Sequence, residues 1–194
     1  MSDTNHRKMS GDQDHLNAEM ARCVVIVGFM GAGKSSVARE LARLLGVTVI
    51  DLDDHITRRE GRTPQELIDE DGEPRFREIE TRALEEILSD DTARFVALGG
   101  GALTAPATRE LLARRNCFII WLDAPFELCW QRIAGDEARP FAREREIAHR
   151  LYEERRKFYE RADCRFEVSE GAGVKTVATE IEEIIRPQIK WAEG

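Results

Sequence analysis

The chain has 194 residues, and 42% of them are hydrophobic, which is enough to bury the core of one domain. Its formal net charge of −8 argues against broad binding to nucleic acid or anionic membranes. No apolar run approaches the roughly 20 residues that span a bilayer. We therefore expect no nucleic-acid partner and no membrane partner.

Residues 1–20 are polar, lack the apolar core of a signal peptide and are predicted to form a disordered tail. The cysteines are scattered and form no C-x-x-C pair, so we expect buried thiols and a cytoplasmic location. Two of them, Cys23 and Cys117, open apolar runs that resemble strands. Residues 21–194 are predicted to form a single domain.

Residues 28–35 read Gly-Phe-Met-Gly-Ala-Gly-Lys-Ser and satisfy G-x-x-x-x-G-K-[ST], the P-loop pattern that cradles phosphates. An apolar, β-branched run precedes this loop and a helical pattern follows it, which is the context that the pattern requires. Lys34 is expected to reach the β- and γ-phosphates of a nucleotide, and Ser35 to hold Mg²⁺. The residues expected to bind the nucleotide here are Gly31, Ala32, Gly33, Lys34, Ser35 and Ser36.

Strand-like and helical segments alternate along the chain, which predicts a parallel sheet between two layers of helices. In such sheets ligands bind at the carboxyl ends of the strands. The predicted strands are 22–27, 47–51, 94–98, 117–122 and 165–168. The predicted helices are 34–45, 54–60, 64–70, 74–89, 106–114, 125–134, 145–161 and 174–190.

Acidic residues follow the second predicted strand. Asp51 and Asp53 are two residues apart, so in an extended chain they point the same way and can hold Mg²⁺ or accept a proton. The alternative is that they cap the next helix, and Asp54 is the residue that we predict as its N-cap. After the third strand, the triple glycine 99–101 either lets a ligand approach the backbone or forms a flexible turn.

Two arginines lie on predicted helices, Arg77 within 74–89 and Arg155 within 145–161. Spacing alone does not distinguish them from salt-bridged surface arginines. Residues 135–147 are charged and contain Pro140, so they are either a mobile cover over the nucleotide or a solvated loop. Arg132 and Arg139, before and within this segment, can contact phosphates.

These motifs occur together and in a fixed order. With the P-loop come Asp51-x-Asp53, Phe76-Arg77-x-x-Glu80, Leu98-Gly-Gly-Gly-Ala102 and Arg139-Pro140. Over residues 22–190 the chain therefore resembles the shikimate kinase family. The resemblance implies a nucleoside-monophosphate-kinase-like α/β fold with a five-stranded parallel sheet in the order 2-3-1-4-5. It also implies a substrate-binding helical region at about 52–90 and a lid at about 135–147.

The reaction implied by the resemblance is the transfer of the γ-phosphoryl group of ATP to the 3-hydroxyl of shikimate, with Mg²⁺, in aromatic amino-acid biosynthesis. Asp53 would bind shikimate hydroxyls and is the candidate base, while Asp51 would support Mg²⁺. Arg77 and Arg155 would clamp the shikimate carboxylate. The neighbouring Arg156 leaves open which of the two adjacent arginines does so.

The remaining implied contacts come from backbone and from the lid. The backbone of Gly99, Gly100 and Gly101 would contact shikimate, Arg139 would reach the phosphates and Arg132 would lie near adenine. Members of the family are mostly monomeric, so a monomer is expected.

Three other functions are compatible with parts of the sequence. A gluconate kinase would share the fold and also binds a polyhydroxy carboxylate. A non-catalytic nucleotide-binding module would keep the P-loop, but the retained Lys34, Asp53 and paired arginines argue against it. The arginine-rich helices can also be interpreted as an assembly surface.

Overall fold

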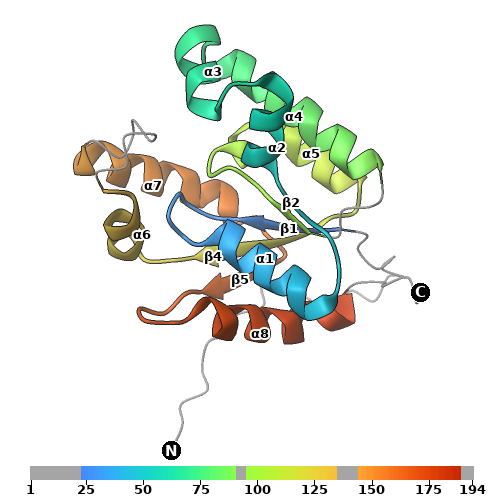
Figure 1. The fold of residues 1–194 in the computed structure, drawn as a ribbon. Helices are drawn as coiled ribbons and strands as arrows, with labels where there is room; N and C mark the ends of the chain where they lie inside the picture. Colours follow the sequence, from blue (N-terminus) through green and yellow to red (C-terminus); the bar gives the residue numbers. More distant parts are fainter. Residues whose placement is uncertain (1–22, 91–94, 135–143, 189–194) are drawn as a thin grey trace, which may run out of the picture.

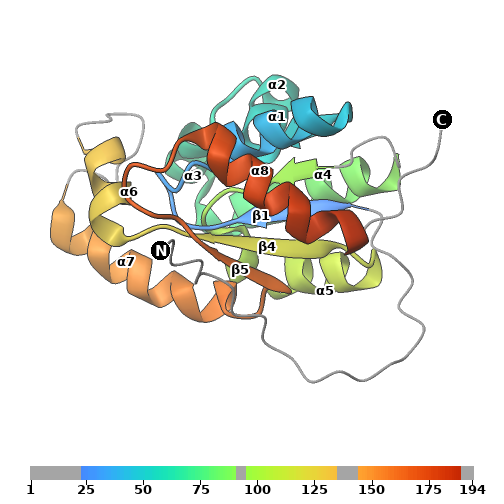
Figure 2. The same ribbon diagram turned by 90° about the horizontal axis from the view of Figure 1, so that it is seen from below.

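Five strands form one parallel sheet in the order β2-β3-β1-β4-β5, which confirms the predicted order. The computed structural model describes residues 23–90, 95–134 and 144–188. Helices cover both faces of this sheet (Figures 1 and 2). The strands are β1 (Val24–Val27), β2 (Val49–Asp51), β3 (Phe95–Ala97), β4 (Phe118–Asp123) and β5 (Cys164–Glu167).

Strand β1 occupies the centre of the sheet. Val24 pairs with Phe95 of β3 on one side and with Phe118 of β4 on the other. All four residues of β1 are buried, which is why the strand is a continuous β-branched run rather than an alternating one. The P-loop therefore leaves the most enclosed strand of the fold.

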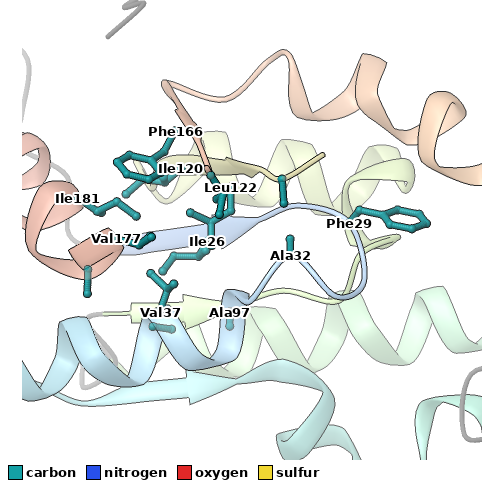
Figure 3. Packing of buried hydrophobic residues seen from close by; sticks show 14 of the residues in the cluster. Ile26, Phe29, Ala32, Val37, Ala97, Ile120, Leu122, Phe166, Val177 and Ile181 are labelled. Carbon is teal, nitrogen blue, oxygen red and sulfur yellow. The ribbon is translucent and has the colours of Figure 1, made fainter. Parts of the chain in front are cut away.

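Side chains of β1 alternate between two apolar cores. Val24 and Ile26 belong to the core under α1 and α8, which also contains Val37 and Ile181 (Figure 3). Val25 and Val27 belong to the core on the opposite face, to which α4 and α5 contribute. The helices are α1 (Lys34–Leu45), α2 (Leu52–Glu60), α3 (Pro64–Asp71), α4 (Glu73–Ser89), α5 (Pro106–Arg114), α6 (Phe126–Ile133), α7 (Arg145–Tyr159) and α8 (Val174–Ile185), with short 3₁₀ turns η1 (Ala102–Thr104) and η3 (Arg186–Gln188).

Helix α2 begins earlier than the sequence predicted. Asp51 ends β2 and is also the N-cap of α2, because its Oδ1 accepts the N–H groups of Asp53 at 3.1 Å and Asp54 at 3.4 Å. The prediction that Asp54 caps this helix is wrong, since extended backbone stops at Asp51 and leaves the next N–H groups to be satisfied. Asp53 consequently lies in the first turn of a helix, not in extended chain.

Two further predicted helices end early. α7 ends at Tyr159 rather than at 161, and α8 ends at Ile185, where η3 replaces the last predicted turn. The predicted tail, residues 1–20, lies outside the described residues, as do 135–143 of the predicted lid, including Arg139. Residues 145–147, assigned to the lid from sequence, form the first turn of α7. None of the helices in the described ranges is long and apolar enough to cross a membrane.

Candidate active site

A cavity of about 940 Å³ opens where β1, β2 and β3 end. It brings together most of the residues predicted from sequence, although they come from five helices (α1, α2, α4, α6 and α7), from the end of β2 and from the loops after β1 and β3. Gly99 and Gly101 are not part of its lining, and Ala32 borders a smaller neighbouring cavity. The predicted residues that line the large cavity are Gly31, Gly33, Lys34, Ser35, Ser36, Asp51, Asp53, Arg77, Gly100, Arg132 and Arg155.

The P-loop is held tightly against α6. A Cβ atom on Gly31, which has φ of +80°, would lie 2.6 Å from the carbonyl oxygen of Cys129. Gly33 is the N-cap of α1 with φ of +98°, and this helix has neither a side-chain cap nor an acidic residue in its first turn. The N-terminus of α1 therefore lies at the cavity without a side-chain cap, and the helix dipole favours an anion there.

Lys34 lies at the start of α1 and folds back along the loop. Its Nζ donates a hydrogen bond to the carbonyl oxygen of Phe29 at 3.0 Å. This contact holds the ammonium group over the loop whose N–H groups would surround a phosphate. Ser35 and Ser36 line the same wall of the cavity.

Asp51 and Ser35 both line the cavity and carry oxygen atoms of the kind that could hold Mg²⁺. The helix cap engages Oδ1 of Asp51, so the second carboxylate oxygen is not used by the cap. Among the described residues there is no group of three or more His, Cys, Asp or Glu side chains that could hold a metal. Mg²⁺ fits this sparse donor set, because it keeps several waters and takes one or two protein oxygens together with phosphate oxygens.

Two arginines from α4 and α7, Arg77 and Arg155, also line the cavity. Arg77 donates to Oε2 of Glu80 at 2.7 Å and to Oε1 of Glu73 at 2.9 Å. Arg155 is only 7% exposed, and burial lowers the pKa of its guanidinium. Within the described part of the chain, no hydrogen bond reaches the buried Nε atoms of Arg77 and Arg155 or Oε1 of Glu80.

The triple glycine forms the surface on which these charged groups lie. A Cβ on Gly99 would be 2.8 Å from Oδ1 of Asp53, and one on Gly100 would be 3.3 Å from Nη1 of Arg155. A Cβ on Gly101 would collide with the guanidinium of Arg77. Any side chain at 99 or 101 would displace a charged group of the site. The interpretation as a mere flexible turn does not explain this packing.

Adjacent arginines on α7 have separate environments. Arg156 donates to Oδ1 of Asp123 at 2.8 Å and to the Tyr152 hydroxyl at 2.9 Å, and it does not line the large cavity. One turn beyond Arg155, the buried Tyr159 hydroxyl donates to the carbonyl oxygen of Gly100. Helix α7 thus fixes Arg155 and the glycine backbone against each other.

Glu80 is a site residue to which the sequence motif gave no role. Its side chain is 1% exposed, and burial raises its pKa to about 7 against the opposing effect of Arg77. The negative charge of Asp53 raises the Glu80 pKa further. A glutamate on a helix is ordinarily exposed, so only its (i, i+3) spacing from Arg77 could have indicated the contact.

We expect Glu80→Gln to flatten the pH dependence of stability. The folded-state pKa of Glu80, about 7, exceeds the ordinary value of 4.5, so the native state binds an extra proton between these pH values. The wild-type free energy of unfolding should therefore fall, by up to about 3 kcal/mol from this group, as the pH rises from 5 to 8. Urea unfolding at several pH values measures this, with the exposed Glu78→Gln as control. If the free energy of unfolding of Glu80→Gln changed with pH in the same way as that of the wild type, this prediction would be wrong.

A smaller cavity of about 240 Å³ adjoins the P-loop on the side of α8. Arg132 borders both cavities and donates to the carbonyl oxygen of Gly31 at 2.8 Å. The sequence analysis missed the segment after β5 that completes this wall, although the rule that ligands bind beyond strand ends could have indicated it. The lining is Ala32, Gly33, Ser36, Val37, Arg132, Val168, Ala172, Val174 and Val177.

Comparisons with known proteins agree with this geometry. A model of the shikimate kinase family matches residues 30–186. Shikimate kinase from Geobacter sulfurreducens is 40% identical over 168 residues, 85% of this chain and 91% of that protein. The one from Persephonella marina is 36% identical over 161 residues, 82% and 96% of the two chains. A solved structure, shikimate kinase from Acinetobacter baumannii in complex with shikimate, has a TM-score of 0.77 and 31% identity and covers 89% of this chain and 97% of its own. The chain therefore belongs to the shikimate kinase family.

Proposed function

We propose that the P-loop, Asp53 and the buried arginines of this cavity carry out the phosphorylation of shikimate. As a member of the shikimate kinase family, the chain is an ATP-dependent kinase that transfers the γ-phosphoryl group to the 3-hydroxyl of shikimate. The carrying observation is that Arg77 and the buried Arg155 line the same cavity as the phosphate loop, with Arg155 packed against the backbone of Gly100.

The acceptor end suits a small carboxylate with hydroxyl groups. A guanidinium as buried as that of Arg155 needs an anion, and two arginines can bind a carboxylate through several charge-assisted hydrogen bonds. Asp53, which lines the cavity and lies against Gly99, would accept hydrogen bonds from hydroxyls at the other end of the molecule. The triple glycine would let the ring approach the backbone.

At the phosphate end, the residues would act mainly by positioning and by neutralising charge. Lys34 and the N–H groups of the P-loop would hold the phosphates, and Arg139 would add a charge from the lid. Ser35 and Asp51 would hold Mg²⁺, which would supply positive charge to neutralise the phosphates. Asp53 would orient the attacking hydroxyl and take its proton.

Arg132 would lie along the adenine ring, with the residues of the smaller cavity on its other side. We further propose residues 52–90 as the substrate-binding region and about 135–147 as the lid, with residues 21–194 forming one domain. The cytoplasmic location, the monomeric state and the absence of nucleic-acid and membrane partners stay predictions from the sequence.

The direct test is ADP release by the purified chain with ATP and Mg²⁺, in the absence of acceptor and with shikimate, quinate or gluconate. Release that depends on shikimate supports the proposal. Release with gluconate alone would keep the kinase chemistry but assign Asp53, Arg77 and Arg155 to a different acceptor. ATP binding without acceptor-dependent release would overturn the proposal in favour of a non-catalytic nucleotide-binding module.

Arg155→Ala should raise the KM for shikimate at least about tenfold while changing the KM for ATP little, because a charged contact to the carboxylate is lost. Steady-state kinetics with each substrate varied in turn measure the two constants. The matched control is Arg156→Lys, since Arg156 is paired with Asp123 outside the cavity. Equal increases in both constants for Arg155→Ala would mean that this arginine only supports the fold.

A further inference from the structure

Two cysteines lie side by side at the amino end of the sheet, opposite to the cavity. Val24 of β1 pairs with Phe118 of β4, and the Phe118 N–H donates to the carbonyl oxygen of Cys23 at 2.9 Å. Cys23 and Cys117 immediately precede this pair on adjacent parallel strands. Both side chains join the core that contains Val25, so they lie on the same face of the sheet.

The two thiols differ in accessibility, and the pKa of Cys117 is lowered. Cys23 is 4% exposed, whereas Cys117 is partly exposed to solvent. A hydrogen bond from the Cys23 thiol and, secondly, the positive charge of Arg115 lower the pKa of Cys117, against burial and the negative charge of Asp163. The single hydrogen of the Cys23 thiol has a second acceptor within reach, the carbonyl oxygen of Val24 at 3.6 Å.

A partly exposed thiol that is more acidic than usual and has a second thiol beside it has the properties of a redox-sensitive cysteine. By contrast, Cys129 is fully buried and burial raises its pKa to about 11. Cys164 is also buried, in β5. Among the described residues, all four cysteines carry thiols rather than disulfides.

We propose that Cys117 is a site of reversible oxidation by peroxide and that Cys23 is its resolving thiol. The Cys117 thiolate attacks one oxygen of hydrogen peroxide, the O–O bond breaks, and sulfenic acid and hydroxide form. The Cys23 sulfur then attacks the Cys117 sulfur and displaces hydroxide. In total two thiols lose two electrons, one peroxide becomes two waters, and a disulfide joins β1 to β4.

The backbone spacing is compatible with this product. Adjacent strands lie about 4.8 Å apart, and disulfides join Cα atoms that are roughly 4.4 to 6.8 Å apart. The bond would therefore form without separating the strands. The pair belongs to neither substrate pocket, so the inference stands apart from the function proposed above.

The test treats the reduced full-length protein with hydrogen peroxide and maps its cysteines by peptide mass spectrometry under non-reducing conditions. We expect a Cys23–Cys117 cross-linked peptide that dithiothreitol removes, with Cys129 and Cys164 remaining as thiols. In Cys23→Ser the sulfenic acid on Cys117 should persist and be trapped by dimedone. Cys164→Ser is the matched control and should form the cross-link at the wild-type rate.

A second test uses the untreated wild-type protein and measures the initial rate at which each cysteine is alkylated. Cys117 should react with iodoacetamide at least about tenfold faster than Cys129 and Cys164, because the thiolate is the nucleophile. The proposal is overturned if no Cys23–Cys117 cross-link forms under peroxide. It is equally overturned if Cys117 reacts no faster than the two buried cysteines.

Discussion

Lys34→Ala is expected to lower kcat at least about 100-fold, because the phosphates lose the cation that neutralises charge developing during transfer. Its Nζ is held over the P-loop by the carbonyl oxygen of Phe29, 3.0 Å away, so the charge is already placed before substrates bind. ADP release at saturating ATP and shikimate measures the effect.

The matched control for this variant is Lys175→Ala, which removes an exposed lysine from the first turn of α8. It should keep wild-type turnover. Lys34→Arg tests whether the positive charge alone is sufficient. Its kcat should lie between those of Lys34→Ala and wild type, because an arginine keeps the charge but not the compact geometry of the ammonium group. Wild-type turnover in Lys34→Ala would remove this residue from the mechanism.

Asp53→Asn should lower kcat about 10²- to 10⁴-fold, with only a small change in the KM for ATP. The substitution preserves shape but removes the negative charge that would orient the attacking hydroxyl and receive its proton. The side chain lies against Gly99, so the amide occupies the same place as the carboxylate. Single-turnover phosphoryl transfer measures the chemical step directly.

Asp54→Asn is the matched control: Asp54 is the next residue in the chain and also borders the cavity, but its carboxylate pairs with Arg39 in a largely exposed contact of 3.1 Å. Surface ion pairs of this kind contribute little to stability. The control should therefore retain wild-type kinetics. If the two variants lost turnover equally, the effect would reflect the start of α2 rather than a specific role of Asp53.

The sequence predicted the sheet and the strand–loop–helix framework of the P-loop well. Both depend on local patterns: a β-branched run such as Val24–Val27 favours a buried strand, and the glycines of the P-loop can adopt the positive φ angles that its turn requires. The strand order came from the resemblance to a family and not from periodicity. It is confirmed because β1 lies between β3 and β4.

The start of α2 could not be predicted in the same way. Asp51, Asp53 and Asp54 are all good N-cap residues, and propensity cannot distinguish them. The cap is chosen by the position at which β2 stops pairing with β3, which depends on tertiary contacts. As a result, the argument for Asp53 from strand alternation was wrong, although Asp53 does line the cavity.

Glu80 and the triple glycine show a second limit of sequence analysis. Burial of Glu80 depends on Arg77 and on the backbone of residues 99–101, which are distant in the chain. A single sequence carries no signal for such a contact beyond the (i, i+3) spacing. The same holds for Arg155 and Arg156. These neighbours leave α7 in different directions, so that Arg155 lines the cavity and Arg156 pairs with Asp123.

The two ends of the cavity are attached to parts of the molecule with unequal resistance to local unfolding. The phosphate loop leaves β1, whose residues are completely enclosed, so opening it requires disruption of the whole sheet. Helix α3, which lies in the region proposed to bind the acceptor, buries only Leu67 and packs mainly on α2 and α4. During gradual denaturation this enzyme should therefore lose its selectivity for the acceptor before it loses its hold on the nucleotide.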